Sequence, residues 1–159
     1  MFNIVTIATK ESEAFLRKKT KVIVDPSSIT RGFIGDMKKT MIAANGIGLA
    51  ANQIGDDRRL FVAIHSRKFY VLINPEIIKV SSEEDEMEEG CLSVPLVYGP
   101  VKRASKVTIQ GTDLRGKLIK IKAVGLLARI FQHEMDHLDG KLFIDRAKGT
   151  YRIEPEQLL

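Results

Sequence analysis

The sequence contains a single cysteine, Cys91, among its 159 residues. One cysteine cannot form an intrachain disulfide, so the fold cannot depend on a framework of covalent cross-links. A lone thiol suits a reducing compartment, where it serves as a buried apolar side chain, a nucleophile or a metal ligand. Cys91 is therefore a candidate for one of these three roles.

Long hydrophobic runs are also absent. No stretch approaches the roughly 18 apolar residues that a membrane-spanning helix requires. The first ten residues lack the basic start and the long apolar core of a secretory signal, and Glu11 and Glu13 argue against a transit peptide. We therefore expect a cytoplasmic protein that does not associate with a membrane.

The basic residues lack the clustering that is typical of nucleic-acid-binding proteins. Lys and Arg number 25 against 20 Asp and Glu, a formal net charge of +5. The few basic clusters, such as Arg17-Lys18-Lys19, contain no aromatic residues. We therefore expect a solvated surface with no direct nucleic-acid readout. A weak attraction to an acidic assembly such as the ribosome is a secondary expectation.

The length predicts a single domain, residues 1–159, with a substantial core. Apolar residues at helical spacing predict a helix from Ile29 to about Ala44 and another within Val124–Gly140, which Gly140 ends. The acidic run Ser81–Glu89 predicts a solvated loop, and Gly111–Gly116 predicts the turn of a hairpin. Further expected elements are short strands at Phe2–Ala8, Lys21–Asp25, Leu60–Ile64, Tyr70–Ile73, Glu76–Val80 and Lys141–Asp145, and a last short helix from Pro155.

The second predicted helix carries His133, Glu134 and His137 in an H-E-x-x-H arrangement. Residues four apart on a helix share a face, so both imidazoles can reach one metal ion. Glu134, one position further round, can reach a water molecule at that metal without binding the metal. The alternative is a solvated helix face that happens to carry two histidines. A catalytic site of this type needs a third ligand from elsewhere in the chain.

Two other segments bear on that choice. The segment Gly46–Gln53 is small and nearly uncharged; it is either a buried strand with glycines for packing or a place where a bound peptide approaches the backbone closely. The segment Gly90–Pro95 contains Cys91. With His133 and His137, Cys91 would give one thiolate and two imidazoles, which leaves a fourth position for water.

Together these three segments resemble the peptide deformylase family. Gly46-Ile47-Gly48-Leu49-Ala50-Ala51-Asn52-Gln53 is similar to its first motif, Glu89-Gly90-Cys91-Leu92-Ser93 to its second, and Gln132-His133-Glu134-Met135-Asp136-His137 to its third. The resemblance spans roughly Lys18 to Asp145. It implies an α+β fold in which mixed and antiparallel sheets wrap around a central metal-binding helix. It also implies removal of the formyl group from the N-terminal formylmethionine of nascent peptides, with release of formate.

The resemblance also implies a role for each matching residue. Cys91, His133 and His137 match the metal ligands, Glu134 matches the general acid/base, and Gln53 and the Leu92 amide match the oxyanion donors. Ile47 and Gly48 match the backbone that pairs with substrate. Leu126 and Ile130 match the wall of the methionine pocket, and the stem of Arg129 lies between them. A thiolate ligand suits a softer divalent metal, so Fe(II), Zn(II) and Ni(II) are all compatible, and the resemblance points to Fe(II).

Charged residues beside the motifs predict a structural network. Glu89 precedes Cys91 by two residues and Asp136 directly precedes His137, so both carboxylates should lie near the metal centre. An unpaired carboxylate there would be costly to bury. Arg103 is the best-placed cation, since its planar guanidinium can bridge two carboxylates. The alternative is that all three residues lie on the surface.

Three other functions would use part of the same set of residues. A zincin endopeptidase would take its third ligand downstream, where Glu154 and Glu156 are candidates. An electron-transfer copper protein would need Met135 as its axial ligand, although Met135 lies two residues from each His and so points away. A formyl-peptide binder without catalysis would have no use for Glu134.

Overall fold

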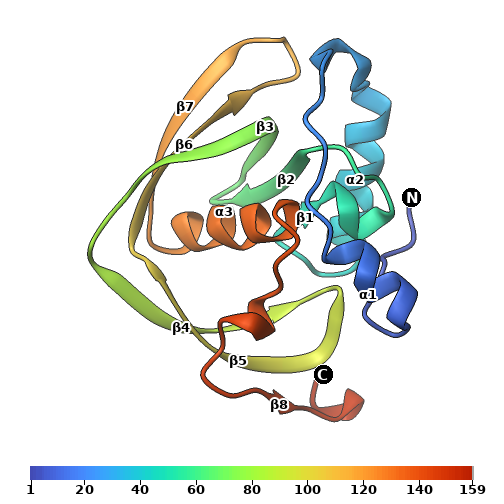
Figure 1. Ribbon diagram of the computed structural model, residues 1–159, viewed down its shortest axis with the longest axis vertical. Coiled ribbons are helices and arrows are strands. Elements are labelled where there is room, and N and C mark those ends of the chain that lie inside the picture. Colours follow the sequence, from blue (N-terminus) through green and yellow to red (C-terminus); the bar gives the residue numbers. More distant parts are fainter. Residues whose placement is uncertain (159) are drawn as a thin grey trace.

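The computed structural model describes residues 1–158 and consists of two antiparallel sheets that enclose a central helix, α3 (Figure 1). The helices are α1 (Lys10–Leu16), α2 (Arg31–Ala43) and α3 (Gly125–Leu138). The strands are β1 (Gly48–Ala50), β2 (Leu60–His65), β3 (Lys68–Val80), β4 (Glu84–Cys91), β5 (Val94–Ala104), β6 (Lys106–Thr112), β7 (Leu118–Val124) and β8 (Tyr151–Arg152). Short 3₁₀ helices lie between or after these elements, at Pro26–Ser28, Ala51–Ile54, Phe143–Asp145 and Pro155–Leu158. The α+β prediction is confirmed.

The larger sheet has the strand order β1-β2-β3-β6-β7, with every neighbouring pair antiparallel. Its inner face is apolar because side chains alternate along each strand. In β7, for example, Lys120 and Lys122 are exposed while Ala123 is buried. This alternation supplies one wall of the core, against which α3 packs.

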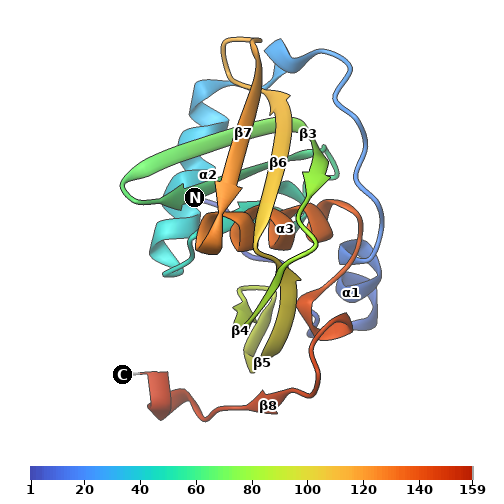
Figure 2. The same ribbon diagram turned by 90° about the vertical axis from the view of Figure 1, so that its left-hand side faces the viewer.

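The smaller sheet has the order β4-β5-β8, and it places Cys91 at the end of β4. Strands β4 and β5 form a hairpin that turns directly after Cys91, where Cys91 pairs with Val94. Figure 2 shows this sheet below α3, with the larger sheet on the other side of the helix. The thiol is thereby brought towards the helix that carries the two histidines.

Helix α3 is buried between the sheets. Phe131 and Leu138 are fully buried, and Phe131 packs against Phe61 and Tyr70 of the larger sheet. Asp139 caps the helix, and Gly140 has a left-handed backbone with φ of 75°. A Cβ at Gly140 would collide with the backbone of Arg17, so this position requires glycine. The predicted helix and its glycine stop are confirmed.

The acidic run was wrongly predicted to be a loop. Residues 84–91 form β4, whose acidic side chains point mainly into solvent while the backbone pairs with β5. Pairing with β5 satisfies the backbone hydrogen bonds on one side of β4, and carboxylates exposed at a sheet edge do not oppose that pairing. Charge along the sequence therefore indicated exposure correctly and secondary structure incorrectly.

Three predicted strands are also absent. Residues 2–6 join no sheet and residues 7–8 form a turn, Lys21 forms only an isolated bridge with Arg58, and residues 143–145 form a 3₁₀ turn. The predicted hairpin appears as β6 and β7, the helix expected at 29–44 as α2, and the helix from Pro155 as a 3₁₀ turn. No helix within residues 1–158 combines the length and the apolar character needed to cross a membrane.

Candidate metal centre and substrate cleft

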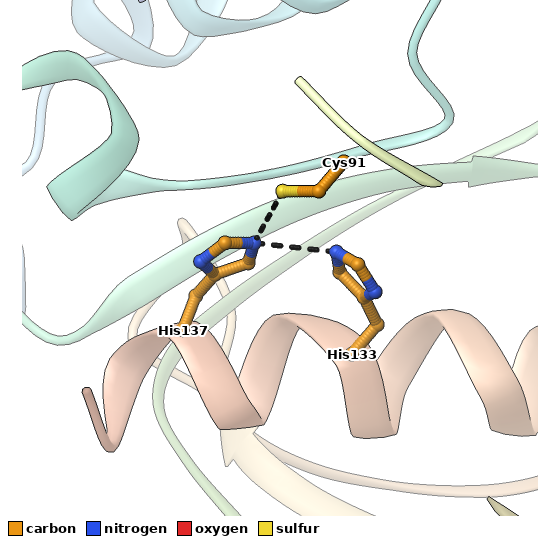
Figure 3. A group of neighbouring side chains, drawn as sticks. All are labelled: Cys91, His133 and His137. Atoms are coloured by element: carbon orange, nitrogen blue, oxygen red, sulfur yellow. Dashed lines mark hydrogen bonds between the residues drawn. The ribbon is translucent and has the colours of Figure 1, made fainter. Parts of the chain in front are cut away.

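The three predicted metal ligands lie together between β4 and α3. The Sγ atom of Cys91 lies 3.1 Å from Nε2 of His137, which lies 3.2 Å from Nε2 of His133 (Figure 3). All three donor atoms lie within 4.8 Å of one another. Both histidines project from the same face of α3 towards the thiol, as their four-residue spacing requires. This convergent set of sulfur and nitrogen donors fits a single divalent metal ion.

The electrostatics of the cluster favour a thiolate. Burial opposes ionisation of Cys91, but the charge of His137 and hydrogen bonds from both imidazoles lower the pKa of the Cys91 thiol well below its usual value. Burial likewise opposes a charge on His133, and its contacts with Cys91 and Glu89 raise the pKa of His133 well above its usual value. A thiolate is the form of cysteine that binds metal. A metal ion at this site would displace the proton that the raised pKa places on His133.

Glu134 lies beside these ligands with only 4% of its surface exposed. Burial raises the pKa of Glu134, and the nearby charges of His133 and His137 partly oppose the rise. Its Oε2 atom has no hydrogen-bond partner among the described residues. The carboxyl group packs against Gly48, where a Cβ would collide with it. Gly48 is therefore needed for Glu134 to occupy this position.

Gln53 is buried and contacts the cluster at Cys91. Its Oε1 atom accepts a hydrogen bond from the Ala50 backbone at 2.9 Å, which fixes the orientation of the amide. The Nε2 group then points to Sγ of Cys91 at 3.6 Å and to Oγ of Ser93 at 3.1 Å. Leu92 is partly buried between these residues and contacts Gly46. The arrangement aims an N–H donor at the space beside Cys91.

The predicted network residues Glu89, Arg103 and Asp136 are buried and in contact. Arg103 donates to Glu89 through Nε at 2.6 Å and through Nη2 at 2.9 Å, and to Asp136 through Nη1 at 2.9 Å. Glu89 also lies 2.8 Å from Nδ1 of His133. Although burial opposes ionisation, bonds with His133 and Arg103 hold the pKa of Glu89 far below its usual value. The network thus joins the Cys-bearing strand to the His-bearing helix.

Two arginines extend this network beyond the sequence prediction. Arg129 donates to Oε2 of Glu89 at 2.6 Å, so its guanidinium is fixed while its stem lines the cleft. Arg146 donates to both oxygens of Asp136 at 2.6 and 2.9 Å. No sequence pattern indicates this role of Arg146, because the position of Arg146 depends on the unpredicted 3₁₀ turn at 143–145.

A cavity of about 590 Å³ opens from the cluster to the surface. All of the predicted substrate-binding residues line this cavity. Ile47 and Gly48 come from the segment around β1, and Leu126, Arg129 and Ile130 come from α3. Ile47 and Leu126 are 48% and 41% exposed, which is high for apolar side chains in a folded protein. The sequence prediction omitted other lining residues, among them Tyr98 and Leu158.

The geometry argues against two of the alternative functions. Met135 is 7% exposed and packs in the apolar core between α3 and the larger sheet, so it is no axial ligand for copper. Glu154 and Glu156 are exposed on the segment after β8 and are absent from the cluster of metal-binding side chains. Cys91 is the third member of that cluster instead, with its sulfur within 4.8 Å of the histidine nitrogens.

The fold and the site define a metallohydrolase of the H-E-x-x-H class, with a thiolate as its third donor. The family model for polypeptide deformylase matches residues 1–152, and the chain belongs to this family. The family consists of metalloenzymes that remove the N-formyl group from nascent polypeptides, and the chain is accordingly a hydrolase of N-terminal protein processing.

Individual relatives agree over most of their length. A peptide deformylase of Dictyoglomus thermophilum is 46% identical over 138 residues, 87% of this chain and 90% of the relative. The crystal structure of the Thermotoga maritima peptide deformylase matches with a TM-score of 0.87 at 34% identity, covering 94% of this chain and 99% of that one. A Met-Ala-Ser-bound class I type b peptide deformylase of Acinetobacter baumannii matches with a TM-score of 0.84 at 30% identity, covering 92% and 99%.

Proposed function

We propose that the single domain formed by residues 1–159 deformylates nascent peptides with one divalent metal ion held by Cys91, His133 and His137. The convergence of these three donor atoms beside the buried carboxyl of Glu134 carries the proposal. A bound ion supplies Lewis acidity at the formyl carbonyl and lowers the pKa of water. Fe(II) is the proposed native metal, with Zn(II) or Ni(II) as replacements, because a site of mixed thiolate and imidazole donors suits all three.

Glu134 is the proposed general base and acid. Its carboxylate takes a proton from the attacking water and delivers it to the departing amine, a role that commonly contributes about 10²–10⁴ in rate. Burial raises the pKa of Glu134, which brings a carboxyl closer to the range in which it can both accept and return a proton near neutral pH.

Gln53 and the Leu92 backbone amide are the proposed donors to the developing oxyanion. The amide of Gln53 is oriented by its bond with the Ala50 backbone, so it needs little rearrangement to donate. Losing one such donor commonly costs about 10²–10³ in rate. Ile47 and Gly48 pair with the peptide backbone, and Leu126, Arg129 and Ile130 enclose the methionine side chain.

The proposed setting is the cytoplasm, where formylmethionyl peptides emerge from the ribosome. The formal net charge of +5 supports a weak attraction to that acidic assembly. The scattered basic residues support no direct readout of nucleic acid, and no partnership with a membrane is proposed.

Formate release from formyl-Met-Ala-Ser tests the proposed function directly. The purified protein loaded with Fe(II), Ni(II) or Zn(II) should release one formate per new N-terminal amine, and the metal-free protein should release none. Acetyl-Met-Ala-Ser is the matched control, since acetyl places a methyl group where the site must fit a hydrogen. Equal turnover of the two peptides, or full turnover without metal, would contradict the proposal.

A further inference from the structure

The segment after β8 lies outside the residues that the family model matches, which end at residue 152. Strand β8 pairs antiparallel with β5, with Tyr151 opposite Tyr98, and the Ile153 N–H then donates to the Leu96 carbonyl at 2.8 Å. Because the strands are antiparallel, the segment 151–153 runs towards the start of β5 and the turn that follows Cys91. It therefore leads from the sheet edge towards the mouth of the cleft.

The segment ends in the 3₁₀ turn Pro155–Leu158, and Leu158 lines the cleft together with Pro95 and Leu96. Figure 2 shows β8 passing below the β4–β5 hairpin. Leu158 is 57% exposed. An exposed leucine on a cleft wall offers apolar surface that a bound ligand can cover.

Strand β8, from which the segment continues, is anchored close to the candidate metal centre. The Tyr151 hydroxyl donates to Oε2 of Glu88 at 3.0 Å, and the rings of Tyr98 and Tyr151 stack with centroids 6.4 Å apart. Tyr98 in turn packs so closely on Gly90 that a Cβ there would lie 2.8 Å from its Cδ1 atom. Gly90 directly precedes Cys91, so the contacts run from the segment to a metal ligand.

The residues that line the cleft relate Leu158 to the proposed methionine pocket. A cavity of about 590 Å³ accommodates several peptide units. In an extended peptide the first and third side chains point to the same side. The walls around the proposed methionine pocket include Glu88 and Tyr98 of the smaller sheet, and β8 extends that sheet towards Leu158. The third side chain therefore faces the wall to which Leu158 belongs.

We propose that Leu158 is a specificity-determining residue that favours an apolar side chain at the third position of the formylated peptide. This inference rests on the proposed function and deepens it, since the same cleft binds the peptide. The segment 153–158 adds a wall that the matched family core does not include.

The test compares kcat/KM for formyl-Met-Ala-Leu, formyl-Met-Ala-Asp and the short substrate formyl-Met amide. The wild-type protein should favour the Leu peptide over the Asp peptide. Leu158→Asp, and separately deletion of residues 155–159, should each lower kcat/KM for the Leu peptide by about threefold to tenfold, the low end of what one apolar contact contributes to specificity. Turnover of formyl-Met amide should not change. Leu118→Asp is the matched control, because Leu118 is 67% exposed on β7 and does not line the cleft.

Several results would overturn the inference. An equal loss for all three substrates would indicate a general effect on the fold, and an equal gain would indicate that the segment obstructs the cleft. No change, or a change only when the leucine is moved to the second position, would remove Leu158 from the third-residue site. Failure of the wild-type protein to turn over formyl-Met-Ala-Ser would instead contradict the proposed function, which separates the two failures.

Discussion

Replacing Arg103 with Met should destabilise the protein and weaken its hold on metal. The Arg103 side chain is 3% exposed and forms three hydrogen bonds, two to Glu89 and one to Asp136. Methionine fills a similar volume without charge, so the variant leaves two buried carboxylates with fewer partners. Removing one partner of a buried ion pair commonly costs about 3–5 kcal/mol.

The remaining contacts set the expected loss at the lower end of that range. Glu89 keeps its bonds with Arg129 and His133, and Asp136 keeps its bonds with Arg146. We therefore expect a loss of about 3 kcal/mol in the free energy of unfolding. At about 2–4 °C per kcal/mol for a protein of this size, Tm should fall by about 6–12 °C.

Metal retention should fall as well, because Glu89 contacts Nδ1 of His133 and orients that ligand. Losing such an outer contact commonly costs about 10–100-fold in metal affinity. Thermal unfolding followed by circular dichroism, with metal analysis after dialysis against a chelator, measures both effects. Arg58→Met is the control, since Arg58 is 34% exposed and its pair with Asp56 contributes about 1 kcal/mol at most. An Arg103→Met variant with unchanged Tm and full metal content would refute the reasoning.

Three further predictions concern the chemistry. Glu134→Gln should retain normal metal content while turnover falls by at least about 10²-fold; a variant that keeps most of its turnover would show that Glu134 is not the proton carrier. In air, the Fe(II)-loaded protein should lose activity faster than the Ni(II)-loaded protein, because oxygen can reach the iron and oxidise the thiolate; equal half-lives would argue against oxidation at Cys91. Formyl-Met peptides should exceed formyl-Asp peptides in kcat/KM by at least about tenfold, the effect of an apolar pocket, and comparable values would displace Leu126 and Ile130 from that pocket.

The helix that carries the histidines was predictable because its local and global signals agree. Its apolar residues recur at helical spacing, its end carries a glycine that the backbone requires, and its polar residues gather on one face. The hairpin of β6 and β7 was predictable for the same reason, since a short polar turn that contains Gly116 separates two alternating segments. In both cases a short stretch of sequence contains all the information that the element needs.

The smaller sheet could not be predicted in this way. Strand β4 has few apolar residues, and its pairing with β5 depends on the backbone and on Glu89, which faces inward to Arg103. No local pattern in the strand marks Glu89 as the inward carboxylate; only its position two residues before Cys91 indicates it. The hydrogen bond from Arg146 to Asp136 also could not be predicted. It depends on the short 3₁₀ helix Phe143–Asp145, whose sequence resembles that of a strand.

The placement of Cys91 on a strand and of the histidines on α3 has a consequence for folding. His133 and His137 are one helical turn apart, whereas Cys91 is 46 positions from His137 in the chain. The unfolded chain therefore offers a metal at most the local histidine pair, and the complete donor set exists only after β4 reaches α3. A metal ion that binds only the native state stabilises it by mass action, by about 2.7 kcal/mol at 100 times its dissociation constant. A metal ion held by Cys91, His133 and His137 would thus close a long loop as a reversible cross-link, a role that the chain, with one cysteine, cannot give to a disulfide.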